Sequence, residues 1–207
     1  MPERTLVDVG ARLAARGLAH GASGNLSIRL DDGSLLITPT RARLGALDAD
    51  RLARLGADGR PIGGDDPSKE WPLHVAIYRV RSHARAIVHL HSRHAVAVAC
   101  LDDLAPDDAL PTYTAYQAMR VGRLRLVPFV PPGDAALGDA VAIAARDSRS
   151  LLLANHGLVA AGIDLEAASA TAEEIEETCA LHLLLGGRRV RLVPDDATAR
   201  LRGDEPA

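Results

Sequence analysis

Three of the eight histidines in this 207-residue chain fall within six positions, in the stretch AIVHLHSRH of residues 86–94. The stretch is rich in Ile and Val and is typical of a β-strand, in which side chains two positions apart point to the same face. His89 and His91 are therefore expected to project together from one rigid strand. Two imidazoles on one face supply half of the four ligands of a zinc site.

A candidate third ligand lies in the stretch LLLANHGLVAAG, residues 151–162. His156 is predicted in a tight turn between two apolar strands, beside Gly157, and from such a turn a side chain can point into a cleft. Three neutral imidazoles that leave a fourth position open are typical of catalytic rather than structural zinc. Because this histidine lies far along the chain from the other two, only the fold can bring it near them.

Three loops rich in small and hydroxyl residues suggest a phosphate site. They are GASGNLS at residues 21–27, TPT at 38–40 and DPSK at 66–69, and the last leads into the start of a helix. Backbone N–H groups, hydroxyls and a nearby Lys meet the charge of a phosphate without bulk in the way. Each loop alone is an ordinary turn, so the prediction depends on their converging.

The elements that must position these groups follow from hydrophobic spacing and turn residues. Pro72 fits a helix only in its first turn, which places Glu70 at the mouth of a helix. Asp164 and Gly186 are start and stop signals of another. Helices are expected over 4–16, about 70–81, 92–101, within the stretch that begins AALGDAV, and over 164–185; strands over 25–30, 34–39, 86–91, 151–154 and 158–162.

Two longer stretches carry weaker patterns. Residues 44–68 predict a loop-rich connection with a short helical turn, and residues 113–134 show strand and turn signals in alternation. Helices interleaved with hairpin-like strand pairs predict a mixed sheet covered by helices, and hence an α/β fold.

Composition limits the class of protein. Hydrophobic residues make up 47% and charged residues 25% of the chain, and no linker divides it, so one domain over residues 1–207 is expected, with a polar tail from about residue 190. Aromatic residues at 2% and a net charge of -3 argue against a nucleic-acid partner. No segment approaches the roughly 18 apolar residues of a membrane span, and the amphipathic N-terminus lacks a secretory signal, so a cytoplasmic protein is expected.

Five motifs in a fixed order, SGNLS, ITPT, PSKEWPLH, IVHLHS and LLANHGLV, resemble the class II aldolase/adducin family of sugar-phosphate enzymes. The resemblance implies a three-layer α/β/α domain with a mixed, mostly antiparallel sheet. It also implies a homotetramer with active sites between neighbouring subunits, acting on a small phosphorylated sugar or sugar acid.

The same resemblance implies a ligand set and a phosphate site. One Zn²⁺ per subunit, or another divalent ion such as Mn²⁺ or Co²⁺, would be held by His89, His91 and His156. Glu70 would be the catalytic acid/base and would ligate the metal when no substrate is bound. The implied phosphate-binding residues are Asn25, Thr40 and Ser68, with Lys69 beside them.

Within the family, the stretches PSKEWPLH, TAYQAMRVGRL and EEIEETCALHLLL most resemble 3-oxo-tetronate 4-phosphate decarboxylases. The implied reaction releases carbon dioxide through a metal-stabilised enediolate, with Glu70 managing the proton at C2, and yields dihydroxyacetone phosphate. The alternatives are a sugar-phosphate aldolase of the fuculose-1-phosphate type, which the same site would serve, and a pentulose-5-phosphate 4-epimerase. A non-enzymatic adducin-like domain would have lost the ligand histidines.

Three residues near these motifs have open roles. Tyr116 falls where the family places a Tyr from a neighbouring subunit, which implies a general acid or a substrate contact. Arg120 could recognise a substrate carboxylate or be a surface charge. Arg41 replaces the family's usual Gly after TPT and could crowd the phosphate loop or bind the anion. The last Tyr of the chain is Tyr116, whereas fuculose-phosphate-type aldolases carry a Tyr in a C-terminal tail, and this weakens the aldolase alternative.

Helix spacing bears on two further features. His74 should share a helix face with Glu70, either as a hydrogen-bonded structural residue or as support for that carboxylate. A late acidic cluster wraps around more than one helix face, which predicts contact with solvent or with another subunit: Glu173, Glu174, Glu176 and Glu177.

Overall fold

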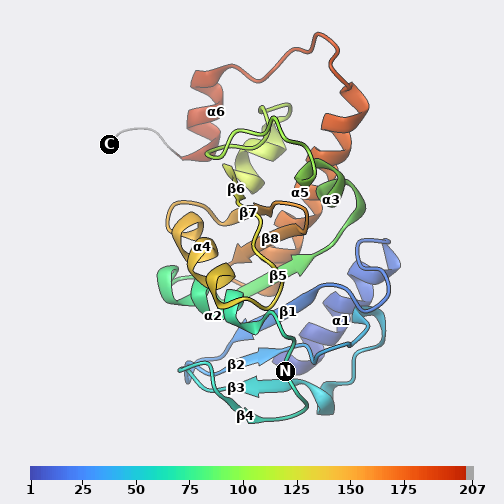
Figure 1. The fold of residues 1–207 in the computed structure, drawn as a ribbon, viewed down its shortest axis with the longest axis vertical. Helices are drawn as coiled ribbons and strands as arrows, with labels where there is room; N and C mark the ends of the chain where they lie inside the picture. Colours follow the sequence, from blue (N-terminus) through green and yellow to red (C-terminus); the bar gives the residue numbers. More distant parts are fainter. Residues whose placement is uncertain (204–207) are drawn as a thin grey trace.

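The computed structural model describes residues 1–203, which are organised around one eight-stranded sheet (Figure 1). The strand order is β4-β3-β2-β1-β5-β8-β7-β6. Neighbouring strands are antiparallel except for β6 and β7, which run parallel. The prediction of a mixed, mostly antiparallel sheet is confirmed.

The bounds of most predicted elements agree with the structure. The strands are β1 (Asn25–Arg29), β2 (Leu35–Ile37), β3 (Ala53–Leu55), β4 (Pro61–Gly63), β5 (Ala86–Leu90), β6 (Leu124–Val127), β7 (Ser150–Leu153) and β8 (Gly157–Gly162). The helices are α1 (Pro2–Ala15), α2 (Trp71–Val80), α3 (Arg93–Ala99), α4 (Ala135–Ala145), α5 (Leu165–Leu185) and α6 (Asp195–Arg202), with short helical turns η1 (Leu44–Ala46), η2 (Ala49–Arg51) and η3 (Gln117–Val121).

Alternation along the central strand β5 divides the apolar side chains between the two faces of the sheet. Ala86, Val88 and Leu90 join a core with residues of α1, α3 and α5, whereas Ile87 joins a second core with residues of α2 and α4. The result is a three-layer α/β/α arrangement (Figure 1). His89 has the same parity as Ile87 and therefore points to the face that α2 covers.

The longest helix, α5, begins and ends where the sequence predicts. The Asp164 side chain caps its start by accepting a hydrogen bond from the Ala167 N–H at 2.7 Å. Gly186 ends it in the left-handed conformation, with φ +48°, which glycine adopts without a steric penalty. Within residues 1–203, no helix has the length and hydrophobicity needed to cross a bilayer.

Two predictions of local structure were wrong. Residues 44–68 contain, besides helical turns, the strands β3 and β4, whose three residues each are too short to display a period of two. Residues 117–121 form a π-helical turn instead of a strand or simple turn. The polar tail contains α6, anchored where Arg202 pairs with Asp108 at 2.7 Å; residues 204–207 of that tail lie outside the described residues.

Candidate active site

The three histidines meet because β8 lies beside β5 in the sheet. In the ladder His89 is opposite Val159 and Leu90 is opposite Leu158, so the turn that precedes β8 lies at the same edge as the end of β5. Gly157 permits this approach, because a Cβ atom there would lie 2.3 Å from the Leu90 carbonyl oxygen. The turn between β7 and β8 therefore places His156 beside His89 and His91.

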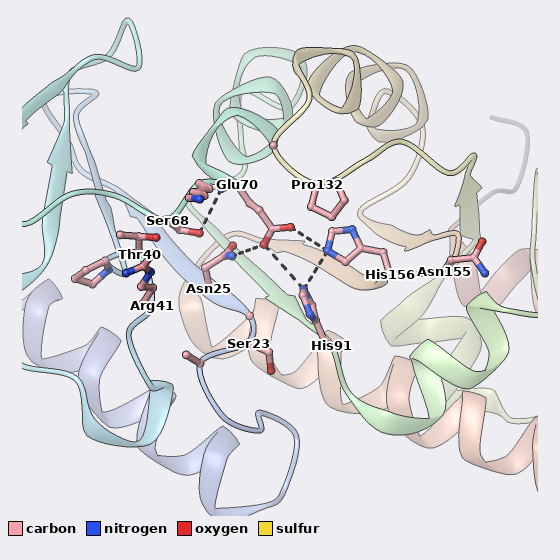
Figure 2. Close-up of a pocket in the computed structure, with 15 residues that line it drawn as sticks. Ser23, Asn25, Thr40, Arg41, Ser68, Glu70, His91, Pro132, Asn155 and His156 are labelled. Atoms are coloured by element: carbon pink, nitrogen blue, oxygen red, sulfur yellow. Dashed lines mark hydrogen bonds and ion pairs between the residues drawn. The ribbon is translucent and has the colours of Figure 1, made fainter.

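The ligand atoms of Glu70, His89, His91 and His156 lie within 4.8 Å of one another, and Figure 2 shows Glu70, His91 and His156 of this group. The Nε2 atom of His91 lies 3.0 Å from that of His89 and 3.1 Å from that of His156. Glu70 completes the group: its Oε1 is 2.9 Å from His156 Nε2 and its Oε2 is 3.3 Å from His89 Nε2. The structure therefore brings together the whole ligand set that the resemblance implies.

The chemistry of this donor set fits a divalent transition-metal ion. His89 Nδ1 lies 2.8 Å from the Leu158 carbonyl oxygen, which can only accept, so Nδ1 carries a proton and Nε2 is the ring atom that faces the cluster. Burial, with His89 and His156 nearby, lowers the pKa of His91 to about 3, so that ring is neutral at pH 7. Neutral imidazoles beside a carboxylate are typical ligands of zinc and its neighbours in the periodic table.

Glu70 is the residue directly before the first turn of α2, and Pro72 lies in that turn, as expected. Its side chain is 11% exposed and forms part of the cavity wall. Burial alone would raise the pKa of Glu70, but the imidazoles of His89 and His156 outweigh burial and hold that pKa below its usual range. The carboxylate is therefore ionised at neutral pH, the form that can bind a cation or accept a proton.

A cavity of about 550 Å³ opens beside the cluster and is lined by all three of the predicted phosphate loops. Backbone hydrogen bonds tie two of these loops together, from Thr40 N to the Asp66 oxygen at 2.9 Å and from Ser68 N to the Thr38 oxygen at 3.1 Å. The convergence on which the phosphate prediction depends is present. The predicted site residues that line the cavity are Asn25, Thr40, Ser68, Lys69, Glu70, His91 and His156.

Two cationic side chains lie at the rim of this cavity. Arg41 and Lys69 are exposed, and neither forms a hydrogen bond or ion pair with another residue in the described part of the chain. Arg41 has φ +59° and Asn155 has φ +56°, and these are the non-glycine residues of the described chain with positive φ. Both line the cavity, and backbone strain of this kind tends to gather at functional sites.

Tyr116 and Arg120 do not join the other predicted site residues. Neither lines the cavity; Tyr116 is 60% exposed at the start of η3, and the Arg120 guanidinium lies 5.7 Å from the centre of its ring. Within a single chain they form a separate exposed pair.

The acidic cluster on α5 departs from expectation at one position. Glu176 is buried and accepts hydrogen bonds from Ser92 Oγ at 2.6 Å and from the N–H groups of His94 and Ala95 at 3.0 and 2.8 Å. The two N–H groups are unpaired donors at the start of α3, so Glu176 caps a helix that begins directly after the histidine strand. The prediction that it contacts solvent or another subunit was wrong.

A polar network lies behind Glu70 and includes two residues that sequence reasoning missed, Ser27 and Tyr78. His74 is fully buried, with Nε2 2.6 Å from Asn25 Oδ1, and Asn25 Nδ2 donates to Glu70 Oε2 at 2.8 Å. Ser27 and Tyr78 extend this contact into the core. Their signal in the sequence is a polar residue at every fourth position of an apolar helix, facing N-x-S on a strand.

Comparison with known proteins places these observations in a family. The model described as Class II Aldolase and Adducin N-terminal domain matches residues 4–183. A protein of Pectobacterium atrosepticum named 3-oxo-tetronate 4-phosphate decarboxylase is 47% identical over 95% of this chain and 90% of its own length. The L-fuculose phosphate aldolase of Escherichia coli is 32% identical over 87% of this chain and 81% of its own.

A solved structure agrees with the same grouping. The Escherichia coli protein YgbL, described as a putative aldolase/epimerase/decarboxylase, superposes with a TM-score of 0.94 at 40% sequence identity, over 97% of both chains. Since the match spans almost all of both chains, the α/β/α fold with its mixed sheet is common to both proteins.

Proposed function

Because the chain belongs to the class II aldolase and adducin family, we propose that it is a metal-dependent carbon–carbon lyase that decarboxylates 3-oxo-tetronate 4-phosphate to dihydroxyacetone phosphate. One observation carries the proposal: the convergence of Glu70 with three histidines at a cavity lined by phosphate-type loops. The relative named for this decarboxylase is closer in sequence than the relative named for fuculose phosphate aldolase, which favours loss of carbon dioxide over aldol cleavage.

His89, His91 and His156 are the residues that would hold the ion, with Glu70 as a further ligand before substrate binds. The donor set suits Zn²⁺, and Mn²⁺ or Co²⁺ would fit the same atoms. When bound, the cation supplies a Lewis acid beside the substrate carbonyl and lowers the energy of the negative charge that develops there.

The loops at the other end of the cavity would bind the substrate phosphate. Thr40 and Ser68 offer hydroxyl donors, and Lys69 and Arg41 offer positive charge at the rim. Asn25 has two amide hydrogens, one of which is on Glu70, so the second is free to meet the phosphate. Anchoring the phosphate in this way would hold the keto-acid end of the substrate against the histidine cluster.

Glu70 would carry the proton that completes the reaction. When the C1–C2 bond of the keto acid breaks, C1 leaves as carbon dioxide and the electron pair remains at C2. The product forms when C2 takes up one proton from solvent, delivered by the carboxyl group of Glu70 at the cavity wall.

The experiment that tests the function combines metal analysis with a coupled assay for dihydroxyacetone phosphate. We expect about one metal ion per chain and product formation from 3-oxo-tetronate 4-phosphate that stops when a chelator is added. Bound metal without this product, but with cleavage of fuculose 1-phosphate, would replace the decarboxylase by the aldolase. A protein that binds no metal would overturn the proposal altogether.

We also propose that the chain works as a homotetramer in which Tyr116 and Arg120 serve a neighbouring subunit's site, as general acid or substrate contact and as carboxylate ligand. Their position outside the cavity of their own chain supports this arrangement. Oligomers assembled from Glu70→Gln and Tyr116→Phe chains should recover activity, because some mixed sites would contain both native residues. Inactive mixed oligomers, or a monomer by light scattering, would contradict shared sites.

The proposed setting is the cytoplasm. The substrate carries a phosphate and a carboxylate, and charged groups of this kind cross a bilayer poorly, so a compartment that makes such compounds retains them. Fractionation of cells that express the protein would test this placement, and recovery in the periplasmic or membrane fraction would contradict it.

A further inference from the structure

The helix α2 and the strand β1 present polar residues to each other at matched intervals. Glu70, His74 and Tyr78 recur every four residues along α2, and Asn25 and Ser27 recur every two along β1. Four residues of helix advance about 6.0 Å and two residues of strand about 6.8 Å, so the two rows stay in step over this distance. The polar side chains can therefore interleave.

The interleaved side chains form one continuous series of hydrogen bonds. Tyr78 OH lies 2.8 Å from Ser27 Oγ, which lies 2.7 Å from His74 Nδ1. His74 Nε2 lies 2.6 Å from Asn25 Oδ1, and Asn25 Nδ2 lies 2.8 Å from Glu70 Oε2, the contact drawn in Figure 2. The four residues behind Glu70 are at most 5% exposed, so water does not compete for these contacts.

Each of these hydrogen bonds has a fixed direction. A carboxylate that ligates a metal can only accept, so Asn25 turns its N–H toward Glu70 and its oxygen toward His74. His74 must then donate from Nε2, which leaves Nδ1 as a lone pair, because burial lowers the pKa of His74 to about 3 and keeps the ring neutral. Ser27 consequently donates to Nδ1 and accepts from Tyr78.

We propose that His74 is a positioning residue of the reaction, and that Ser27 fixes its tautomer. The Nε2–H of His74 holds the Asn25 amide with its N–H on Glu70; without that donor the amide could turn over and set its oxygen against the carboxylate. The proposal rests on the proposed function only in taking Glu70 as the proton carrier. The proposal also gives a reason for the buried polar residues. Core packing alone does not require them, since apolar side chains of similar size would fill the same space.

The first test is a spectrum of the wild-type protein. Histidine labelled with ¹⁵N in the metal-loaded enzyme reports which ring nitrogen carries the proton, and loss of one signal in His74→Gln assigns the residue. We expect a neutral His74 protonated at Nε2 alone, and a mixture of tautomers in Ser27→Ala. A wild-type His74 protonated at Nδ1 would overturn the proposal.

The second test separates positioning from packing by kinetics. His74→Leu should lower kcat about 10–100-fold, the usual loss when a supporting partner of an active-site group is removed, with KM and metal content near wild type. His74→Gln, which restores an N–H donor, should recover part of the loss. Ser34→Ala is the matched control, since it deletes a hydrogen bond of 2.6 Å from a buried hydroxyl to Asp32 Oδ1, in the turn between β1 and β2, and should lower only the melting temperature.

The outcomes are distinct from those that bear on the substrate. If His74→Leu behaves like Ser34→Ala, with a lower melting temperature and unchanged kcat, His74 is a packing residue and the proposal fails. If His74→Leu does not fold, the tautomer spectra of the wild type and of Ser27→Ala decide. Failure of the enzyme on 3-oxo-tetronate 4-phosphate would overturn the proposed substrate and leave the tautomer result standing.

Discussion

The histidine cluster and the cationic rim formed by Arg41 and Lys69 share one cavity, but they are held in different ways. His89 is fully buried in a central strand, paired on both sides, and Glu70 is supported from behind by Asn25. Arg41 and Lys69 project from loops and are exposed. The difference suggests a division of labour: groups that react are fixed by the sheet, whereas groups that capture the substrate keep freedom to adjust. Changes to the cluster should therefore lower kcat, and changes to the rim should raise KM.

Removal of the metal should have the largest effect. Chelation should abolish activity, and added Zn²⁺ should restore it. The reason is that the metal ion is the positive charge that the cluster would hold beside the substrate carbonyl. His91→Ala should lower the metal content in the same way, and His91 is the most exposed of the three histidines, so the fold should tolerate its loss. If the protein were fully active in chelator, and elemental analysis showed that it was free of metal, the histidine cluster would have no role in the reaction.

Glu70→Gln should produce the next largest effect. Positioned acid/base catalysis contributes about 10²–10⁴-fold, so kcat should fall by that factor while the three histidines retain the metal. KM should change little, because the phosphate loops are untouched. Steady-state kinetics with metal analysis of the same sample checks this outcome, and near-normal turnover would remove Glu70 from the mechanism.

Substitutions at the rim should give the opposite pattern. Ser68→Glu should raise KM steeply, because a carboxylate there would repel the phosphate. Arg41→Gly should raise KM about 10–100-fold, the worth of one hydrogen bond to a charged group. Glycine suits the φ of +59°, so this variant should be at least as stable as the wild type.

A control variant makes the Arg41 result specific. Asn155→Gly relieves the other positive φ of the cavity without removing a charge, and its KM should stay near wild type. Kinetics of both variants with phosphorylated substrate, together with their melting temperatures, separate charge from backbone strain. An unchanged KM in Arg41→Gly would mean that this guanidinium does not bind the anion.

The same division explains how much the sequence could predict. His89 and His91 were accessible because two residues on one strand need only the local period of two. Assigning His156 to them required the order of the sheet, in which β8 lies beside β5, and the residue pattern does not contain that order. The phosphate loops were visible as motifs, and their convergence depended on the hydrogen bonds between residues 38–40 and 66–68.

The residues that were missed share a cause. Glu176 is 84 positions from Ser92, and helix periodicity records which face it occupies but not which helix start it meets. Ser27 and Tyr78 come into contact only because the side chains of α2 and β1 that face each other recur at matching intervals. The exposed pair Tyr116 and Arg120 shows the converse: a motif suggests a role, and the chain by itself places the residues elsewhere.

The smallest expected effect is a difference in how acid changes the stability of variants in the buried network and at the rim. Burial lowers the pKa of His74 to about 3 in the folded protein, below the value of about 6.5 for an unfolded chain. Since unfolded protein then binds the extra proton more readily, the stability is complete above pH 6.5 and falls as the pH drops toward 3. At pH 5.5 the loss from this residue should be about 1.4 kcal/mol. Urea unfolding of metal-loaded wild type and His74→Gln at pH 7.5 and 5.5 measures this loss. The change in unfolding free energy between the two pH values is compared between the two proteins, because every other group is common to both. Equal pH dependence in the two would mean that His74 is not held neutral by burial, whereas Arg41→Gly, which changes only the rim, should follow the wild type.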